Sequence, residues 1–449
     1  MSHAPDETQT HRHRLRNIVG GSAGNLVEWY DWYIYAAFSL YFAPVFFPEG
    51  DPTSQLMSTA AIFAVGFVMR PIGAWIMGIY ADHRGRKAGL TLTVSLMCLG
   101  SLAIAFTPTY AAIGPAAPVI LTAARMLQGL SLGGEYGSSA TYLSEVAGRR
   151  RRGFYSSFQY VTLIGGQLVA LAVLLVLQFT LTEAELEAWG WRIPFAIGAV
   201  LALVVFYIRR RLTETESFTR ARASGAPRSS TANLFRDHPR EALLVMALTA
   251  GGTLAFYAYT TYMQKFLVNT TGFDRQTASQ VMTAALFVFM CLQPLSGALS
   301  DRIGRKPVMA TFGVLGVIAT VPIFTALETV QDPLAAFALV MAALLIVTGY
   351  TSINSIVKAE LFPTKIRALG VGLPYALTVA IFGGTAEMIA LALKKAGLES
   401  LYFFYVAGCI AISLVTYYFM RETSAESTID AEAVVDAVEP EPTMATVRG

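Results

Sequence analysis

The sequence predicts an all-α membrane protein of twelve transmembrane helices, arranged as two pseudo-symmetric bundles of six. Of its 449 residues, 54% are hydrophobic and 14% are charged, which excludes a soluble protein of this size. The apolar residues form twelve runs long enough to span a bilayer. Two polar motifs each occur once in either half of the chain, which indicates a duplicated six-helix unit.

The clearer repeat is a charged motif between apolar runs. Residues 78–87 read GIYADHRGRK and residues 297–306 read GALSDRIGRK, so both follow G-x-x-x-D-x-x-G-R-K. Each copy predicts a tight turn between two membrane helices, with glycines that allow close helix approach and basic residues at a membrane face.

A second polar repeat marks the ends of later apolar runs. Glu145 and Arg152 in the first half recur as Glu360 and Arg367 in the second half. Because both repeats keep their places relative to the apolar runs, the sequence predicts two homologous halves of about six helices each.

The expected membrane helices follow the apolar runs in order, each with about 20 residues or more. They are residues 18–46, 55–81, 88–107, 117–146, 153–180, 190–210, 241–268, 277–300, 307–327, 333–361, 368–393 and 399–420.

Polar stretches divide the chain into five parts. The two bundles are residues 18–210 and 241–421, and the polar residues 211–240 are expected to form a cytoplasmic linker. The N-terminal residues 1–17 lack a short apolar core, so we expect no cleavable signal peptide and insertion directed by the first helix. The tail, residues 422–449, is acidic with two prolines and is expected to be disordered.

Basic residues predict how the chain lies in the membrane. Of the 33 lysines and arginines, 25 lie in the N-terminus, the linker, the tail and the loops on the same side as these. The loops on the opposite side are short or acidic. By the positive-inside rule, we expect both termini in the cytoplasm.

Carboxylates within the predicted spans are the first functional candidates. Glu28 and Asp31 lie three residues apart on one face of the first helix. Each needs a cation or a proton inside a bilayer, so we favour a proton-carrying role for at least one, with Asp31 the deeper; a permanent ion pair is the alternative. Glu135 and Glu387 serve either helix packing or a proton relay.

Arg70 and Arg125 lie well inside the predicted spans, and the planar guanidinium group suits a carboxylate of the protein or of a ligand. We expect Arg125 to pair with Asp31 or Glu28 and also to contribute to the substrate site. We expect Arg70 to bind a substrate carboxylate, with a structural pair to Glu135 as the alternative.

Uncharged polar residues of the spans are candidates to line a cavity, although most such residues in helix bundles form interhelical hydrogen bonds. The candidates are Tyr33, Gln159, Tyr257 and Gln264. Lys265 and Lys358 lie near predicted helix ends, where lysine reaches the membrane interface, so we assign them no role.

The sequence lacks the motifs of ATP-driven transporters, metal sites and hydrolases. The chain has no G-x-x-x-x-G-K-[ST] loop, no metal-spaced set of histidines and cysteines, and no nucleophile elbow. Its three cysteines lie far apart in apolar runs, which indicates no disulfide framework. We therefore expect a carrier that is not an enzyme, with no cofactor, no metal and no nucleic-acid partner.

Longer motifs resemble a known family. The two repeated turns and RMLQG at residues 125–129 resemble motifs of the major facilitator superfamily, although His83 stands where arginine or lysine is usual. Over about residues 17–420 the chain resembles the metabolite:proton symporter family, and its 2-oxoglutarate branch most of all. The stretches that carry this are NLVEWYDWY, MRPIGAW, QGLSLGGEYGSSATYLSEVA, FYSSFQYVTLIGGQL, WGWRIPFA, TTYMQKFLVNT, MTAALFVFM and RALGVGL.

The resemblance implies the major facilitator fold and a bacterial inner-membrane symporter that imports 2-oxoglutarate with a proton. It implies that Arg70 and Arg192 are sensitive positions, which we place at the substrate site, and that charged helix ends act in gating. The gating residues are Asp82, Arg86, Glu145, Arg152, Asp301, Arg305, Glu360 and Arg367.

Other interpretations stay open at this point. The substrate could be citrate, another dicarboxylate or shikimate, and a transporter-like sensor would bind a ligand without moving it. We expect a monomer in the lipid bilayer, with a small organic acid and protons as its partners.

Overall fold

The structure is a computed structural model that describes residues 7–84, 86–133, 135–146, 149–210, 231–363, 365–425 and 427–429. Throughout these ranges the chain forms helices joined by short connections, and none of the described residues forms a β-strand. Most of the predicted linker and most of the predicted tail lie outside the described residues.

The first half contains six membrane spans. They are α1 (Glu7–Phe46), α2 (Pro52–Arg84), α3 (Arg86–Phe106), α5 (Ala116–Gly133) followed by α6 (Glu135–Val146), α7 (Arg152–Thr180) and α9 (Ile193–Arg210). Short helices connect them: α4 (Tyr110–Ile113), η1 (Arg149–Arg151), α8 (Glu183–Ala188) and η2 (Gly190–Arg192). A capping box between Thr182 and Glu185 fixes the start of α8.

The second half begins with the short helix α11 (Thr231–Asp237), within the predicted linker, and repeats the six spans. They are α12 (Pro239–Tyr257) continued by α13 (Met263–Asn269), α14 (Arg275–Ile303), α15 (Arg305–Thr329), α16 (Pro333–Thr351) continued by α17 (Asn354–Glu360), α18 (Arg367–Thr378) continued by α19 (Ala386–Lys395), and α20 (Glu399–Phe419).

Three spans of the second half are interrupted. π-helical segments, η3 (Ala258–Tyr262) and η4 (Val379–Gly383), break two of them, and a turn separates α16 from α17. Such breaks free backbone groups inside a bundle and are frequent at functional sites.

Ten helical spans among the described residues are long and apolar enough to cross a membrane. The other two spans, α1 and α5–α6, carry Asp31 and Arg125, polar residues that lower the hydropathy of their helices. Together they make the twelve predicted spans, and the predicted all-helical fold is confirmed.

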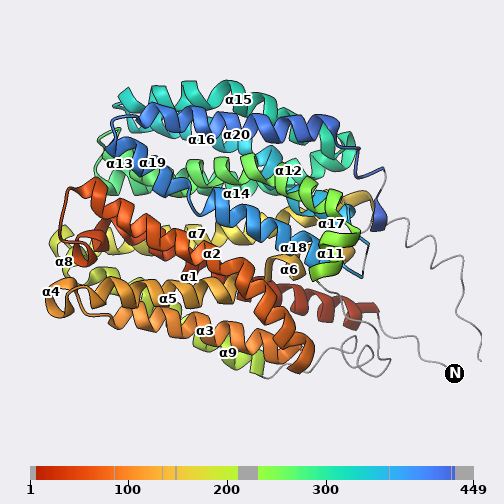
Figure 1. Ribbon diagram of the computed structural model, residues 1–449, viewed down its shortest axis with the longest axis horizontal. Helices are drawn as coiled ribbons and strands as arrows, with labels where there is room; N and C mark the ends of the chain where they lie inside the picture. Colours follow the sequence, from red (N-terminus) through yellow and green to blue (C-terminus); the bar gives the residue numbers. More distant parts are fainter. Residues whose placement is uncertain are drawn as a thin grey trace, which may run out of the picture.

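The two halves lie side by side, the first in red to yellow and the second in green to blue (Figure 1). Across the interface α7 packs along α14, and α2 and α6 pack against α18. The described part of the chain starts and finishes at the end of the bundle that carries α11, as an even number of crossings requires (Figure 1). We call this the α11 end and the opposite one the α8 end.

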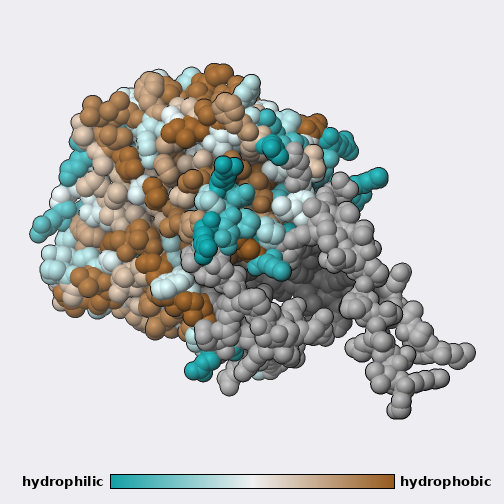
Figure 2. All heavy atoms as spheres, turned by 45° about the vertical axis from the view of Figure 1, so that its right-hand side comes forward, coloured by the Kyte–Doolittle hydropathy of each residue, from teal (hydrophilic) through white to brown (hydrophobic). Residues whose placement is uncertain are grey.

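The flanks of the bundle are apolar. Hydrophobic side chains dominate the visible flank, and hydrophilic ones gather mainly towards its ends (Figure 2). Phe106, Leu334 and Phe419 are each more than 70% exposed. A surface of this kind is unfavourable in water and fits the hydrocarbon of a bilayer.

The start of the tail differs from the expected disorder. Glu422 accepts hydrogen bonds from the backbone N–H groups of Arg305 and Lys306, at 2.8 and 2.9 Å, and so caps α15. Burial alone would raise the pKa of Glu422, but these hydrogen bonds lower the pKa below its ordinary value. The acidic composition of the tail predicted disorder. Composition alone cannot show that one carboxylate, Glu422, binds the N-terminus of α15.

Candidate functional site

Asp31 of α1 is fully buried and is held by side chains from two other helices. Ser101 of α3 donates a hydrogen bond to Asp31 Oδ1, and Gln128 Nε2 of α5 donates to Oδ2 at 2.9 Å. Arg125 Nη1 in turn donates to Gln128 Oε1 at 2.6 Å. The amide of Gln128 therefore connects the carboxylate to the guanidinium, and we call this arrangement the Asp31–Gln128–Arg125 relay.

The expected direct pair of Arg125 with Asp31 or Glu28 is not what the structure shows. The hydrogen bond described for Arg125 goes to Gln128, and Nε and Nη2 have no hydrogen-bond partner among the described residues. Instead the guanidinium is surrounded by aromatic rings, which stabilise a cation through their faces. Its Cζ lies 4.1, 4.5 and 5.1 Å from the ring centroids of Trp32, Tyr35 and Phe63.

Arg70 of α2 is the second aromatic-bound arginine, and it is 3% exposed. Among the described residues, its Nη1 has no hydrogen-bond partner and no carboxylate lies within ion-pair distance. The side chain of Glu135, its alternative partner, lies outside the described residues. The Arg70 Cζ lies 5.1, 5.3 and 5.2 Å from the ring centroids of Trp29, Trp32 and Phe67.

Helices α2 and α5 approach each other closely. As a result, Arg70 of α2 and Arg125 of α5 both lie beside the indole of Trp32. At the contact, a Cβ atom on Gly133 would lie 2.7 Å from the backbone nitrogen of Ala74. Only glycine permits this spacing. Small residues in the GLSLGG segment thus position Arg70 and Arg125 next to each other.

A small cavity of about 10 Å³ lies between the halves, which is room for about one water molecule. It is lined by Tyr33, Ala36, Ala37, Gln167, Leu171, Thr260, Thr261, Gln264 and Met282. Two predicted cavity residues, Tyr33 and Gln264, are therefore brought together. An organic acid needs a larger space, so the halves are closed around this point.

The other predicted cavity residues lie nearby in the bundle. Tyr257 packs edge-on against Phe67, the ring that also faces Arg70, with 5.1 Å between ring centroids. Gln159 accepts a hydrogen bond from Ser139 at 2.7 Å, and its Nε2 has no partner among the described residues. These contacts fit either a cavity wall or interhelical packing, the alternative noted above.

Arg192 is not brought together with Arg70. Its Nη1 donates to the carbonyl oxygens of Ala105 and Thr107, at 2.8 and 2.6 Å, at the C-terminal end of α3. A cation at a helix C-terminus satisfies unpaired carbonyls and the helix dipole. The geometry gives Arg192 a structural contact at the α8 end.

Lys358 of α17 is fully buried, although its place near a helix end indicated a snorkelling side chain. Its Nζ donates to Asn354 Oδ1 at 2.8 Å and to the hydroxyl of Tyr136 at 3.3 Å. Nζ also lies 4.0 Å from the ring centroid of Tyr375. Sequence reasoning missed this residue because the turn between α16 and α17 directs its side chain inward.

Lys265 and Glu387 also lie inside the second half, where Lys265 was expected to reach the interface. Lys265 Nζ pairs directly with Glu387 Oε2 at 3.2 Å and is fully buried. The two residues follow the π-helical segments η3 and η4, which bring α13 and α19 together. This is a closed ion pair within one half of the molecule.

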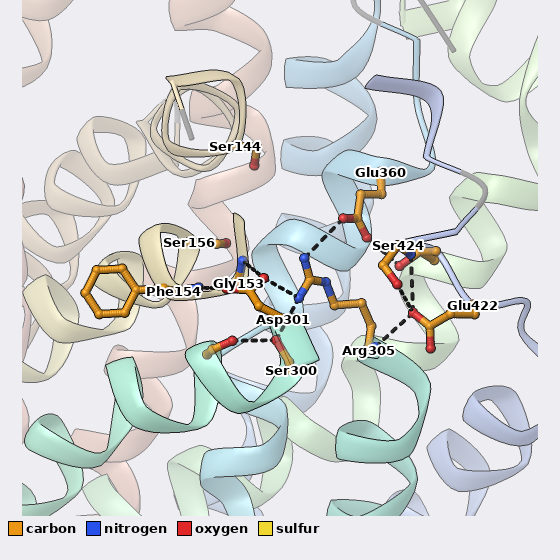
Figure 3. Close-up of polar contacts among 12 residues, drawn as sticks. Ser144, Gly153, Phe154, Ser156, Ser300, Asp301, Arg305, Glu360, Glu422 and Ser424 are labelled. Atoms are coloured by element: carbon orange, nitrogen blue, oxygen red, sulfur yellow. Dashed lines mark hydrogen bonds and ion pairs between the residues drawn. The ribbon is translucent and has the colours of Figure 1, made fainter. Parts of the chain in front are cut away.

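At the α11 end, Asp301 joins the halves (Figure 3). Its two oxygens accept hydrogen bonds from the backbone N–H groups of Gly153 and Phe154 in the first turn of α7, at 2.7 and 2.9 Å. Arg305 supports Asp301 at 2.8 Å and contacts Glu360 at 3.5 Å. The implied pair of Arg305 and Glu360 therefore forms within the second half, and Asp301 makes the contact across the interface.

Of the remaining gating candidates, the structure describes the side chains of Arg367 and Arg152. Arg367 is buried, and its Nε donates to the carbonyls of Ala359 and Phe362 at 3.2 and 3.0 Å. Arg152 is also buried. The side chains of Asp82, Arg86 and Glu145 lie outside the described residues.

At the α8 end, an ion pair joins the halves. Arg275 of α14 contacts Glu183 and Glu187, at 3.0 and 2.7 Å. A pocket of about 400 Å³ opens beside this pair, between residues that include Tyr41, Gln178 and Phe273. In the part of the chain that the structure describes, the interface is thus bridged at both ends, and this pocket lies at the α8 end.

Comparisons with known proteins agree with this architecture. The profile of the Major Facilitator Superfamily matches residues 27–384 and 264–441. The chain is 58% identical to the alpha-ketoglutarate permease of Escherichia coli (strain K12) over 88% of this chain and 91% of that protein. It is 33% identical to the citrate-proton symporter of Klebsiella pneumoniae over 85% of each chain.

Among solved structures, the D-xylose-proton symporter matches with a TM-score of 0.71 and 17% identity, over 91% of this chain and 98% of that one. At this identity the likeness supports the fold alone. The twelve-helix arrangement of two halves agrees with it.

Proposed function

The chain belongs to the Major Facilitator Superfamily of membrane transporters, and from this premise we propose that it imports 2-oxoglutarate together with a proton by alternating access. The similarity to the alpha-ketoglutarate permease supports the substrate, and the names of the citrate-proton symporters support coupling to protons. The proposal includes a monomer in the inner membrane, with both termini and the α11 end in the cytoplasm.

Arg70 carries the proposal for the substrate. A buried guanidinium is costly unless an anion joins it, and among the described residues Arg70 has no carboxylate partner and its Nη1 has no hydrogen-bond acceptor. Its planar group binds a carboxylate through two parallel hydrogen bonds. We therefore assign a carboxylate of 2-oxoglutarate to Arg70, next to Tyr257 and Phe67.

The Asp31–Gln128–Arg125 relay supports the proton site. With Asp31 ionised, the relay balances one negative and one positive charge inside the membrane. A proton on Asp31 leaves Arg125 without this compensation, which favours an anion nearby. Proton binding and substrate binding then strengthen each other, as linkage requires.

The two bridged ends of the interface support alternating access. Opening at the α8 end requires Arg275 to separate from Glu183 and Glu187. Opening at the α11 end requires Asp301 to leave the first turn of α7. Because each contact exists only when its end is closed, removal of one favours the state open at that end.

Counterflow in proteoliposomes tests the proposal. Purified protein should exchange labelled 2-oxoglutarate in preference to citrate and shikimate, and an inward proton gradient should drive accumulation that a protonophore abolishes. Ligand binding without exchange would instead identify a sensor. A preference for citrate would support the second substrate, which the citrate-proton relatives favour.

A further inference from the structure

Lys358 is a buried cation that the proposed function does not yet use. It lies on α17, a short helix that starts after the break at residues 352–353, and its side chain reaches the interface between the halves. Its hydrogen-bond acceptors, Asn354 Oδ1 and the Tyr136 hydroxyl, are both neutral. Tyr136 belongs to α6 of the first half, so the ammonium group is shared between both halves.

No described carboxylate lies within ion-pair distance of Lys358 Nζ. The other buried lysine of the described residues shows the contrast, because Lys265 contacts Glu387 directly. A buried ammonium group is costly without a counter-charge, none is found among the described residues, and ionisable groups inside membrane spans are functional by default. Lys358 and Arg70 thus form a set of two buried cations without described carboxylate partners, one in each half.

Two stacked tyrosines lie beside Lys358 at the interface between the halves. One tyrosine, Tyr136, comes from the first half and the other, Tyr375, from the second. Their ring centroids lie 3.6 Å apart, and the angle between the ring planes is 10°. Lys358 Nζ lies 5.3 and 4.0 Å from their ring centroids. Arg70 lies on α2 and Lys358 on α17, and both helices pack against α18, the helix that carries Tyr375. Arg70 and Lys358 therefore lie on neighbouring helices at the interface between the halves.

We propose that Lys358 binds the second carboxylate of a dicarboxylate substrate whose first carboxylate is bound by Arg70. This inference rests on the proposed function and adds a specificity-determining residue to its site. Two cations without described carboxylate partners match the charge of a dianion. A substrate held from both halves also favours their closure around it, because only the closed state offers both contacts.

Arg125 is less suited to this second role. Its guanidinium is surrounded by three rings of α1 and α2 and is connected to Asp31 through Gln128, all within the first half. Lys358 contacts the interface directly. The geometry therefore divides the cations between coupling, for Arg125, and substrate binding, for Arg70 and Lys358.

Competition in counterflow assays with Lys358→Gln tests this role. The variant should need at least about tenfold more 2-oxoglutarate for half-maximal exchange, the loss expected for one charged hydrogen bond. Its affinity for a monocarboxylate competitor such as 2-oxopentanoate should stay within about threefold of wild type. Lys358→Arg should recover part of the dicarboxylate affinity. Arg70→Gln should weaken binding of both compounds.

The controls separate this inference from the function on which it rests. Lys395→Gln removes an exposed lysine of the same half and should leave affinity unchanged. Thermal unfolding in detergent identifies a variant that merely fails to fold, and Lys358→Met gives a second substitution without charge. Wild-type dicarboxylate affinity in Lys358→Gln and Lys358→Met overturns this inference alone. A wild-type protein that moves no dicarboxylate overturns both proposals.

Discussion

The two halves neutralise a buried carboxylate in different ways. In the second half, Glu387 contacts Lys265 directly at 3.2 Å. In the first half, Asp31 reaches Arg125 only through the amide of Gln128, with hydrogen bonds of 2.9 and 2.6 Å. A direct buried pair is held by its own attraction, whereas a relayed pair leaves the carboxylate and the cation able to exchange partners. On this basis we expect the ion pair in the second half to serve packing and the relay in the first half to serve coupling.

Removal of one partner from the direct pair should give the largest effect. Lys265→Met leaves Glu387 buried without a cation and should lower the free energy of unfolding by about 3–5 kcal/mol. The double variant Lys265→Met with Glu387→Leu should recover most of this loss, because no charge remains buried. Thermal unfolding in detergent measures both. A single variant as stable as wild type would show that Glu387 does not depend on Lys265.

Asp31→Asn should separate exchange from accumulation. The amide mimics a permanently protonated carboxyl group, so binding and counterflow should persist, while no proton is released. Proton-driven accumulation should therefore fall by about tenfold or more, a factor within the range that coupling between two sites typically gives. Uptake under an imposed proton gradient measures this.

Glu28→Gln is the matched control for Asp31→Asn, because Glu28 is buried one turn away on the same helix. We expect it to keep accumulation. Normal accumulation in both variants would contradict the relay as the coupling site and direct attention to Glu135 or Glu387.

Loss of the relay itself should have an intermediate effect. Gln128→Leu removes a hydrogen bond from each of Asp31 and Arg125 but keeps both charges, so the ratio of accumulation to exchange should fall about threefold to tenfold. Gln293→Leu is the control from the second half, since Gln293 is equally buried but bonds the hydroxyl of Thr351. Equal ratios in the two variants would remove Gln128 from the coupling mechanism.

The smallest expected effect is on stability, from a substitution of Glu422 at the α11 end of the bundle. Glu422 is stabilised by backbone N–H groups, and Glu422→Gln should lower stability by about 0.5 kcal/mol at neutral pH. Since its folded-state pKa is below the ordinary 4.5, the contribution is present above that pH and is lost as pH falls through the lower value. Unfolding of both proteins between pH 3 and about 7 should show the difference vanish in acid.

Sequence reasoning reached the fold and the charged residues for definite physical reasons. Membrane spans are set by local hydropathy, and the repeated turns report the duplication, so both can be read from one chain. Arg70, Arg125 and Asp31 stood out because charge inside an apolar run is costly. These are properties of single segments.

What sequence reasoning missed depends on contacts between segments. Gln128 lies three residues after Arg125, a spacing that places both on one helix face, but its bond to Asp31 joins α5 to α1. The inward direction of Lys358 follows from a helix break at residues 352–353, which the apolar run conceals. The capping of α3 by Arg192 likewise requires η2 to meet the end of α3, which is distant in the sequence.

The indole of Trp32 lies between the two arginines of the first half and gives the protein an optical reporter. The Cζ atoms of Arg125 and Arg70 lie 4.1 and 5.3 Å from the centroid of this ring. The ring of Trp29 also lies beside Arg70. A bound carboxylate that screens Arg70 changes the electric field at these indoles and should shift their fluorescence emission. Label-free titration can then follow substrate binding, with Trp75 and Trp189 on the exposed surface replaced by phenylalanine to reduce background.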